Sequence, residues 1–411
     1  MQYTHLQVIG IALLCGLVSV ITAIFMNPLI LKLAYKKHLT DVPNHRKLQK
    51  RPVPILGGMS VYLALINGLF ICNFMYPTDN LYVVIAALSL IFFMGFFDDL
   101  LDLSVLFRFI VEFGVVFLLW TFGYRIDTFA GLFGITHIPM VWSCLLSMFA
   151  GVGLMNAFNL VDGVDGLASG LGLFTTSICG LYFITHHDPL FAMLSVVLVG
   201  SLMFFFICNV FSKKYKMYIG DSGSLILGLL AYVFSCRILQ NPILDWNDQY
   251  RVSMLIAIYA IPVFDTLRVM FGRIAHRHSP FSADKTHLHH ILLQLHYPHI
   301  MVTAILLLIN SIVIGIWYHT TFYIHSIDLQ FFCTLITSIL AIQALYFSLE
   351  QISIRFPQYF ERMAQRAEKA SSWPIKFRNQ VRDLIDGNVK RRIRMRRAKH
   401  KAKKALEKEQ K

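Results

Sequence analysis

The sequence predicts an all-α, polytopic integral membrane protein with about eleven transmembrane helices. Three observations predict this class: 56% of the 411 residues are hydrophobic, the mean hydropathy is +0.60, and the apolar residues fall into long blocks separated by polar loops. A soluble domain of this size is less apolar. A helix that crosses the hydrocarbon core of a bilayer needs about 20 mostly apolar residues, and these blocks have that length.

We place the spans from the apolar blocks in chain order, with boundaries uncertain by about four residues. The first block has no charged segment ahead of it and no small-residue cleavage site, so we expect it to be retained rather than removed as a signal peptide. Each later block is bounded by polar loops. The eleven predicted spans are 6–28, 55–75, 81–97, 107–123, 139–155, 167–185, 190–210, 222–240, 252–270, 300–318 and 329–349.

The distribution of basic residues predicts the orientation. Loops after odd-numbered spans hold fifteen Lys and Arg residues, whereas loops after even-numbered spans hold three. Basic residues accumulate in cytoplasmic loops of membrane proteins. We therefore expect a periplasmic N-terminus and a cytoplasmic C-terminus.

The net charge of +14 is concentrated in a tail. Residues 355–411 contain nineteen basic and six acidic residues, whereas residues 1–354 are nearly neutral. Basic residues directly after a membrane span favour contact with anionic headgroups over nucleic acid, at about 1 kcal/mol per residue near the surface. We predict a transmembrane catalytic domain at 1–354 and a basic cytoplasmic tail at 355–411. The seven cysteines are scattered singly in or near spans and indicate neither a disulfide framework nor a zinc site.

Four polar clusters stand at the ends of predicted spans. Carboxylates at a membrane boundary are costly unless they face water, a cation or a ligand. The clusters follow the third, fifth, seventh and ninth spans, so the predicted topology places all of them on the cytoplasmic face. They are FFDDLLD (96–102), NAFNLVDGVDG (156–166), YIGDSGS (218–224) and SPFSADKTHLHH (279–290). The sequence thus predicts one cytoplasmic site built from distant segments.

The first two clusters are rich in carboxylates. Asp98 and Asp99 are adjacent at the end of an apolar helix, where neighbouring side chains diverge by about 100°, so we expect only one to point into a given site. Such a pair suits a Mg²⁺ site or a general base, and a solvated helix end is the alternative. Asn156, Asn159, Asp162 and Asp165 recur every third residue, and a Gly follows each Asp. Glycine favours a helix break with approachable backbone; a structural Asx-rich turn is the alternative.

The other two clusters suit phosphate. Asp221 lies in Gly-Asp-Ser-Gly-Ser directly before an apolar helix, where free N–H groups favour phosphate, although an ordinary N-cap explains the same residues. His287, His289 and His290 lack the helical i, i+4 spacing of a metal pair and lie in a basic segment, so they suit donors to phosphate oxygens. A basic loop that obeys the positive-inside rule is the alternative. Carboxylates for Mg²⁺ and cations for phosphates are the parts that phosphoryl transfer requires. At a membrane surface they imply one soluble and one lipidic substrate.

With these motifs the chain resembles the polyprenyl-phosphate N-acetylhexosamine-1-phosphate transferases, and among them the bacterial undecaprenyl-phosphate N-acetylglucosamine-1-phosphate transferases. The resemblance runs from about residue 8 to 350. Muramyl-pentapeptide relatives carry a lysine shortly after the paired aspartates, where this chain has Leu100, Leu101 and Asp102, so the GlcNAc branch is favoured. The motifs are DVPNHRKLQKRPVPILGGMSVY (41–62), GFFDDLLDLSVLFR (95–108), NAFNLVDGVDGL (156–167), YKMYIGDSGSLILG (215–228) and SPFSADKTHLHH (279–290).

The resemblance implies a reaction and a location. With Mg²⁺ as the cofactor, and Mn²⁺ as its substitute, UDP-GlcNAc and undecaprenyl phosphate would react to give lipid-linked GlcNAc-pyrophosphate and UMP. This would be the first step of a cell-surface polysaccharide of the O-antigen or enterobacterial-common-antigen type, within lipopolysaccharide biosynthesis. The protein would lie in the bacterial inner membrane with its active site facing the cytoplasm. A homodimer is possible, and nucleic acid is not expected as a partner.

The resemblance also implies residue roles. Asp221 and Asp98 would bind magnesium, and Asp98 is in addition a candidate base toward the lipid phosphate. Catalytic roles fall to Asp98, Asp99, Asp162 and His287. The residues assigned to substrate binding are Lys50, Arg51, Asn156, Asn159, Asp165, Asn209, Tyr218, Arg273, His289 and His290.

Several alternatives remain open from the sequence. The lipid phosphate could attack the donor directly, which we favour, or the reaction could pass through an aspartyl-phosphate. Another UDP-N-acetylhexosamine or UDP-muramyl-pentapeptide could be the donor. A more distant alternative is an ion-coupled transporter, although transporter sites usually lie near the bilayer midplane rather than at one surface.

Overall fold

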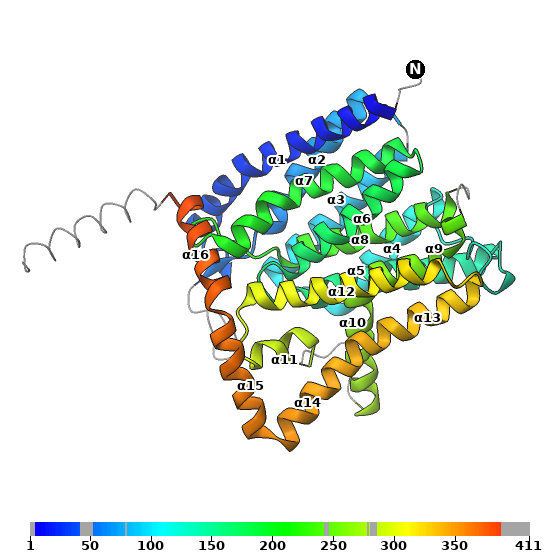
Figure 1. Ribbon diagram of the computed structural model, residues 1–411. Helices are drawn as coiled ribbons and strands as arrows, with labels where there is room; N and C mark the ends of the chain where they lie inside the picture. The colour runs from blue at the N-terminus through cyan, green and yellow to red at the C-terminus, as the bar shows by residue number, and fades with distance from the viewer. Residues whose placement is uncertain are drawn as a thin grey trace, which may run out of the picture.

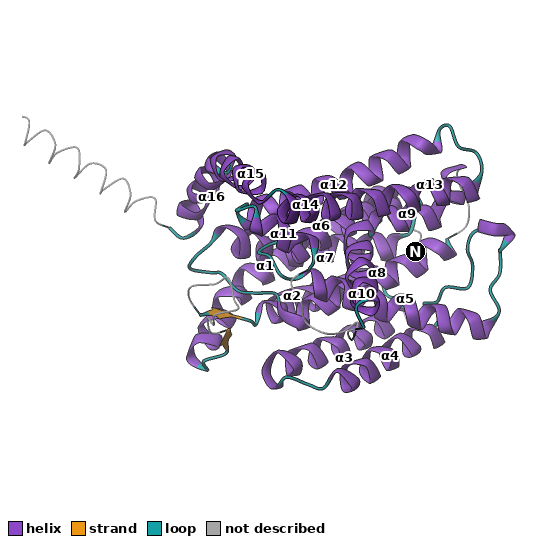
Figure 2. Ribbon diagram, turned by 90° about the horizontal axis from the view of Figure 1, so that it is seen from below, coloured by secondary structure: helices purple, strands orange, loops and turns teal. Residues whose placement is uncertain are grey.

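Long apolar helices, most of them running in the same general direction, form the body of the protein (Figure 1). The computed structural model describes residues 5–41, 52–78, 80–241, 246–277, 279 and 286–387. The only strands among these residues are β1 (Thr40–Asp41) and β2 (Val53–Pro54), which form a short antiparallel ladder (Figure 2). The all-α, polytopic class predicted from the sequence is confirmed.

The first half of the bundle consists of eight helices. Two of them begin at side-chain caps: Ser104 accepts a hydrogen bond from the Phe107 N–H, and Asp188 from the Phe191 N–H. A single 3₁₀ turn, Leu132–Gly134, lies between the fourth and fifth helices. The helices are α1 (His5–Lys36), α2 (Gly57–Met75), α3 (Asn80–Leu101), α4 (Val105–Thr121), α5 (Met140–Val161), α6 (Leu167–Thr185), α7 (Pro189–Phe211) and α8 (Gly220–Gln240).

The second half is less regular. The predicted ninth span is divided into α9 and α10, which meet at 59°, and the predicted eleventh span is a helix with a π-helical turn at Leu340–Ala344. A 3₁₀ turn, Trp246–Tyr250, precedes α9. The helices are α9 (Arg251–Ile258), α10 (Ala260–Ala275), α11 (Leu288–Gln294), α12 (His299–Thr321), α13 (Ile327–Ile339), α14 (Leu345–Arg355), α15 (Pro357–Ala370) and α16 (Ser372–Ile385).

Each of the eleven predicted spans coincides with a helix or a broken helix. Within the described ranges, nine helices are long and apolar enough to cross a membrane, or ten if the bent pair α9–α10 is one span. The fourth predicted span corresponds to α4, which has only 17 residues. The count of eleven crossings and the orientation of the termini stay predictions.

Helix α8 is the centre of the bundle. In the most apolar stretch of α8, 94% of the residues are buried, whereas the corresponding stretch of α1 is only 33% buried. It contacts α2, α3, α5, α6 and α9. A helix that is apolar on all sides is stable only when other helices surround it. Because α8 is held from all sides, its first turn provides a fixed position for the polar residues at its start.

The strands bring the start of α2 against the segment before α8. The Tyr218 N–H donates to the Pro54 carbonyl at 2.8 Å, and the Gly57 and Gly58 N–H groups donate to the carbonyls of Tyr218 and Ile219 at 2.9 and 2.8 Å. The basic loop that contains Lys50 and Arg51 lies outside the described residues. The residues that follow this loop, from Pro54 to Gly58, therefore lie beside the Tyr218–Gly220 turn.

The C-terminal helices return to the bundle. α14 leads into α15, and α16 then lies against the end of α7 (Figure 1). α15 is amphipathic, with Ala364 and Ala367 buried and Arg362, Arg366 and Lys369 in its sequence. The described part of the predicted tail is thus folded as far as residue 387, whereas the basic run 390–404 lies outside the described residues.

Candidate active site

The four polar clusters gather at one end of the bundle: hydrogen bonds join the first and third, an ion pair with Lys216 joins the second, and the fourth reaches them by close packing. Asp99 from the first cluster binds the backbone of Asp221 and Ser222. Lys216, just before the third cluster, pairs with Asp165 of the second. His289 of the fourth cluster packs against Gly163, where a Cβ atom would stand 2.4 Å from the ring Nε2. Segments more than 100 residues apart in the chain thus line one site.

Asp98 and Asp221 face each other across Arg108. The Arg108 Nη1 lies 2.7 Å from the Asp98 Oδ2 and 3.2 Å from the Asp221 Oδ2. Asp98 also accepts a hydrogen bond from the Leu103 N–H at 2.9 Å. The Asp221 carboxylate is the more accessible of the two, with 31% of its side chain exposed against 6% for Asp98. Two carboxylates from α3 and α8 therefore converge on a place that holds positive charge.

Asp99 has a different environment. It accepts hydrogen bonds from the Asp221 N–H at 2.9 Å, the Ser222 N–H at 3.2 Å and the Ser222 hydroxyl at 3.0 Å. These donors belong to the first turn of α8, where N–H groups have no partner inside the helix. Gly220 has a φ of +68° and lies so close that a Cβ would be 2.6 Å from the Asp99 Oδ2. Asp99 thus fixes the helix that carries Asp221.

The loop between α5 and α6 carries Asp162 and Asp165. Burial raises the pKa of Asp162 well above its usual value, and the charges of Asp221, Asp99 and Asp165 raise it further. Burial would also raise the pKa of Asp165, but His299 and Lys216 outweigh it and lower that pKa to about 2. Asp165 is therefore ionised at neutral pH, whereas Asp162 binds a proton far more readily.

Asp165 is surrounded by basic side chains. Its Oδ2 lies 2.6 Å from the Lys216 Nζ, 3.1 Å from the His299 Nδ1 and 4.0 Å from the Arg378 Nη2. Its Oδ1 is buried without a hydrogen-bond partner among the described residues. Lys216 also lies over the Tyr218 ring, 5.5 Å from its centroid. One carboxylate shared by the cations Lys216 and Arg378 leaves positive charge that an anionic ligand can use.

The three histidines are not equivalent. Burial lowers the pKa of His289 to about 3, and the neighbouring His290 and His287 lower it further, so its ring is neutral at pH 7. The His289 and His290 ring centroids lie 4.2 Å apart. His287 is buried, and its Nδ1 lies 2.9 Å from the Asp265 Oδ2. Its Nε2 has no hydrogen-bond partner in the described part of the chain.

Sequence reasoning missed Asp265, Glu112 and Arg108 as site residues. Asp265 orients His287 and also pairs with Arg268 at 2.8 Å. Glu112 is 1% exposed and accepts a hydrogen bond from the Asn156 amide at 2.6 Å. Charged residues inside apolar spans are functional candidates by default, and that signal was present at Asp265 and Glu112. Arg108 was counted only as a loop charge.

The remaining predicted residues have separate places. The Asn209 amide donates to the Met217 carbonyl at 2.7 Å, which holds the loop that carries Lys216. Asn159 lines the same groove as Asn156. Arg273 is 6% exposed near the end of α10. Lys50 and Arg51 lie outside the described residues, so their assignment stays a prediction.

A groove leads from the surface of the bundle to Arg108. It has a volume of about 330 Å³ and lies between α4, α5 and α10. Its polar lining is Arg108, Glu112, Asn156, Asn159 and Thr266, and its apolar lining is Val105, Phe109, Phe113, Phe149, Val152, Leu160 and Met270, with Gly153 between them. Phe149 is 75% exposed, so the apolar part opens toward the outside of the bundle. Arg108 belongs to both the groove and the Asp98–Asp221 cluster.

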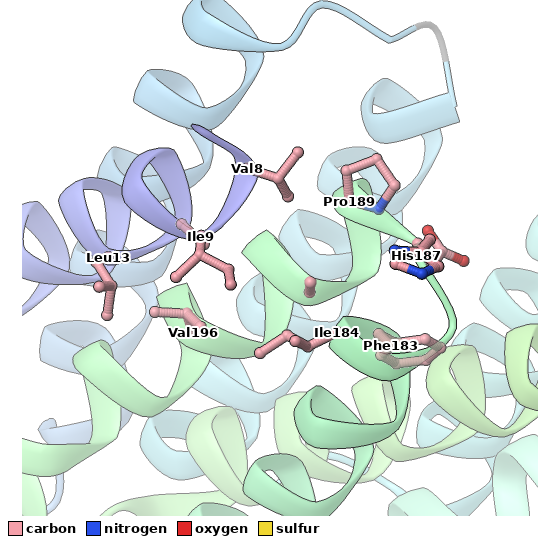
Figure 3. A pocket seen from close by; sticks show the side chains of 11 residues that line it. Val8, Ile9, Leu13, Phe183, Ile184, His187, Pro189 and Val196 are labelled. Atoms are coloured by element: carbon pink, nitrogen blue, oxygen red, sulfur yellow. The ribbon is translucent and has the colours of Figure 1, made fainter. Parts of the chain in front are cut away.

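A second pocket lies between α1, α6 and α7, with Val8, Ile9 and Leu13 facing Phe183, Ile184 and Val196 (Figure 3). Its lining is mainly apolar, and the carboxylate of Asp188 at its edge is already paired with Arg237. None of the predicted site residues lines it. The Asp98–Asp221 end of the bundle is therefore the candidate active site.

Fold and site together define a class: a polytopic α-helical membrane protein with a carboxylate- and cation-rich site at one end of its helices. Residues 81–238 match the model of glycosyl transferase family 4. The chain is 32% identical over 327 residues to the decaprenyl-phosphate N-acetylglucosaminephosphotransferase of Mycobacterium leprae, covering 73% of this chain and 81% of that protein. It is similar, at 27% identity over 297 residues, to the probable undecaprenyl-phosphate N-acetylglucosaminyl 1-phosphate transferase of Bacillus subtilis, with 72% and 81% covered.

The undecaprenyl-phosphate alpha-N-acetylglucosaminyl 1-phosphate transferase of Escherichia coli K12 is 28% identical over 269 residues, which are 64% of this chain and 71% of that protein. The chain belongs to the family of polyprenyl-phosphate N-acetylhexosamine-1-phosphate transferases, and the resemblance seen in the sequence is confirmed.

Proposed function

We propose that this protein transfers N-acetylglucosamine-1-phosphate from UDP-GlcNAc to undecaprenyl phosphate, giving lipid-linked GlcNAc-pyrophosphate and UMP. The observation that carries the proposal is the position of Arg108. This cation ends an apolar groove and at the same time pairs with the carboxylates of Asp98 and Asp221. A long apolar chain with a phosphate at its end matches that arrangement, and relatives named for prenyl phosphates support it.

The acceptor side follows from the groove. Phe109, Phe113 and Phe149 offer apolar contact area for a prenyl chain, and burying a CH₂ group is worth about 0.8 kcal/mol. The guanidinium of Arg108 offers a planar set of donors that suits a phosphate. The groove therefore delivers the lipid phosphate to the Asp98–Asp221 cluster.

The donor side follows from the Asp165 surroundings. Lys216, His299 and Arg378 gather around one carboxylate, and the buried His287 ring lies 5.6 Å from the ring of His289, which packs on the same loop. An ammonium group such as that of Lys216 stabilises the charge of a pyrophosphate. Tyr218, under Lys216, provides a ring for contact with a base.

Asp98 and Asp221 suit Mg²⁺, with Mn²⁺ as a substitute. No group of three or more His, Cys, Asp or Glu side chains is arranged to hold a metal within the described ranges. Two carboxylates that already share a cation nevertheless fit an ion that takes few protein ligands and completes its shell with waters and phosphate oxygens. When bound, Mg²⁺ would neutralise charge on the pyrophosphate oxygens.

We favour direct attack for the chemical step. An oxygen of the lipid phosphate attacks the β-phosphorus of the donor, the bond to the oxygen that bridges to the α-phosphate breaks, and UMP leaves with the electron pair. Asp99 accepts three hydrogen bonds from α8, which leaves it poorly suited to act as a nucleophile. The product would begin a cell-surface polysaccharide of the O-antigen or enterobacterial-common-antigen type, made at the cytoplasmic face of the inner membrane.

UMP release by the purified protein tests the proposal. The full chain is incubated with undecaprenyl phosphate, Mg²⁺ and, in separate reactions, UDP-GlcNAc, UDP-GalNAc or UDP-muramyl-pentapeptide. We expect UMP only with UDP-GlcNAc and only in the presence of both Mg²⁺ and the lipid. Release with another donor would change the sugar but keep the chemistry. Folded protein that releases no UMP with any donor would contradict the proposal and favour a transporter.

A filled groove should weaken acceptor binding. No atom lies within 4 Å of a Cβ built on Gly153, so a side chain can start there without a clash, and Gly153→Leu places an isobutyl group in the groove. Leucine also has the higher helix propensity. We expect the KM for undecaprenyl phosphate to rise about tenfold, the loss of one to two buried CH₂ contacts, with an unchanged KM for UDP-GlcNAc. Gly272→Leu, on α10 with equally open space, is the matched control.

A further inference from the structure

The helix α16 holds the end of α7 and the loop that follows it. The Arg378 Nε donates to the Val210 carbonyl at 2.9 Å. Asp386, the C-cap residue of α16, accepts hydrogen bonds from the Ser212 hydroxyl and from the Lys213 N–H, the latter at 3.1 Å. The Phe377 and Phe211 rings meet edge to face with centroids 6.1 Å apart. α16 is therefore fastened to the segment that leads to Lys216.

Arg378 also reaches the donor side of the site. Its Nη2 lies 4.0 Å from the Asp165 Oδ2, whereas Lys216 lies 2.6 Å from the same oxygen. Asp165 is 6% exposed, and a carboxylate buried to that degree needs a permanent counter-charge. Arg378 suits this purpose because a guanidinium does not lose its proton in proteins.

Lys216 and Arg378 differ in how firmly they are held. Arg378 is fixed by its bond to the Val210 carbonyl. Lys216 has a flexible stem, and its ammonium contacts Asp165 and the face of Tyr218. When a diphosphate enters, Lys216 is the cation that can turn toward it. Arg378 then stays beside Asp165.

We propose that Arg378 is a positioning residue for donor binding: with α16 docked on α7, it keeps Asp165 compensated, and Lys216 becomes free to bind the donor diphosphate. This inference rests on the proposed function. It gives the C-terminal cytoplasmic segment a role in the site, beyond contact with lipid headgroups.

The test compares four full-length variants: Arg378→Met, Arg378→Lys, Asp386→Asn and Lys376→Met. Lys376 is exposed on the same helix and provides the control for loss of one basic charge. We expect Arg378→Met to raise the KM for UDP-GlcNAc about tenfold, a usual size for coupling between a remote group and a site. The kcat and the KM for undecaprenyl phosphate should stay within about twofold. Arg378→Lys should recover part of the loss, Asp386→Asn should show a smaller rise, and Lys376→Met should match the wild type.

The outcomes separate the inference from the function on which it rests. Wild-type UMP release with an unchanged donor KM in Arg378→Met would overturn the inference alone. An equal rise of both KM values, or a fall in kcat without a change in donor KM, would also overturn it, since α16 would then act as a general support. A wild-type protein that is folded and releases no UMP would overturn the proposed function itself. If Arg378→Met does not fold, Arg378→Lys and Asp386→Asn decide.

Discussion

Asp221→Asn is expected to lower the rate of UMP release by at least about 10³-fold while leaving the thermal unfolding temperature unchanged. The carboxylate faces Arg108 and Asp98 and is partly exposed, so its charge serves the site rather than the fold. The backbone N–H of Asp221 is bound by Asp99, and asparagine leaves that bond intact. Activity measured beside thermal unfolding in the same detergent checks both parts.

The neighbouring Asp99→Asn is the informative comparison. In the wild type, the Asp221 N–H donates to one carboxylate oxygen of Asp99 and the Ser222 N–H to the other. Asparagine has only one acceptor oxygen, so its NH₂ group would face one of these N–H donors and that hydrogen bond would be lost. Loss of a cap of this kind costs about 1 kcal/mol. We expect Asp99→Asn to lower both activity and the unfolding temperature. Near-wild-type activity of Asp221→Asn would refute the metal assignment.

The difference between Asp98 and Asp99 was within reach of the sequence. Adjacent residues on a helix diverge, and the two carboxylates have different partners in the structure: Asp98 faces Arg108, while Asp99 faces the backbone of α8. The sequence could not predict which of the two carboxylates faces Arg108 and which binds the start of α8. That depends on the position of the first turn of α8, 122 residues further along the chain.

The partners of Asp165 show where sequence reasoning ends. Lys216 is 51 residues away and His299 is 134 residues away, and neither belongs to a motif shared with Asp165. In the sequence, Lys216 counted as a basic loop charge and Arg378 as part of the basic tail, and neither assignment says anything of their contacts. Only the packing of α16 on α7 brings Arg378 to the site.

The predicted ninth span shows a further limit. Hydropathy gave one helix over 252–270, whereas the structure breaks it at Tyr259. Pro262 lies in the first turn of α10, a position where proline is tolerated because its missing N–H would have no partner there. The proline was a signal for a new helix start. Its consequence, an α10 turned by 59° that carries Asp265 to His287, needed the three-dimensional arrangement.

That Asp265–His287 pair leads to the second large effect. His287→Gln is expected to lower UMP release by about 10²–10³-fold, the usual loss when one donor to a developing negative charge is removed. The Asp265 Oδ2 holds the His287 Nδ1 at 2.9 Å, and the Leu288 N–H donates to the same carboxylate, so the ring is fixed with its Nε2 directed away from Asp265. Glutamine keeps a polar side chain of similar length but lacks the imidazole ring.

Asp265→Asn should act through the same ring and through the fold. It weakens the pair with Arg268 and the hydrogen bonds at the start of α11, so we expect lower activity together with a lower unfolding temperature. His276→Gln is the matched control, because His276 is exposed in the same basic region and its Nδ1 lies 2.8 Å from the Gly272 carbonyl oxygen of its own turn. Wild-type rates for His287→Gln would show that the buried ring supports α11 and has no contact with the reacting phosphates. A large loss of UMP release in His287→Gln and Asp265→Asn, with the wild-type rate in His276→Gln, would place the reacting pyrophosphate at the Nε2 side of the His287 ring.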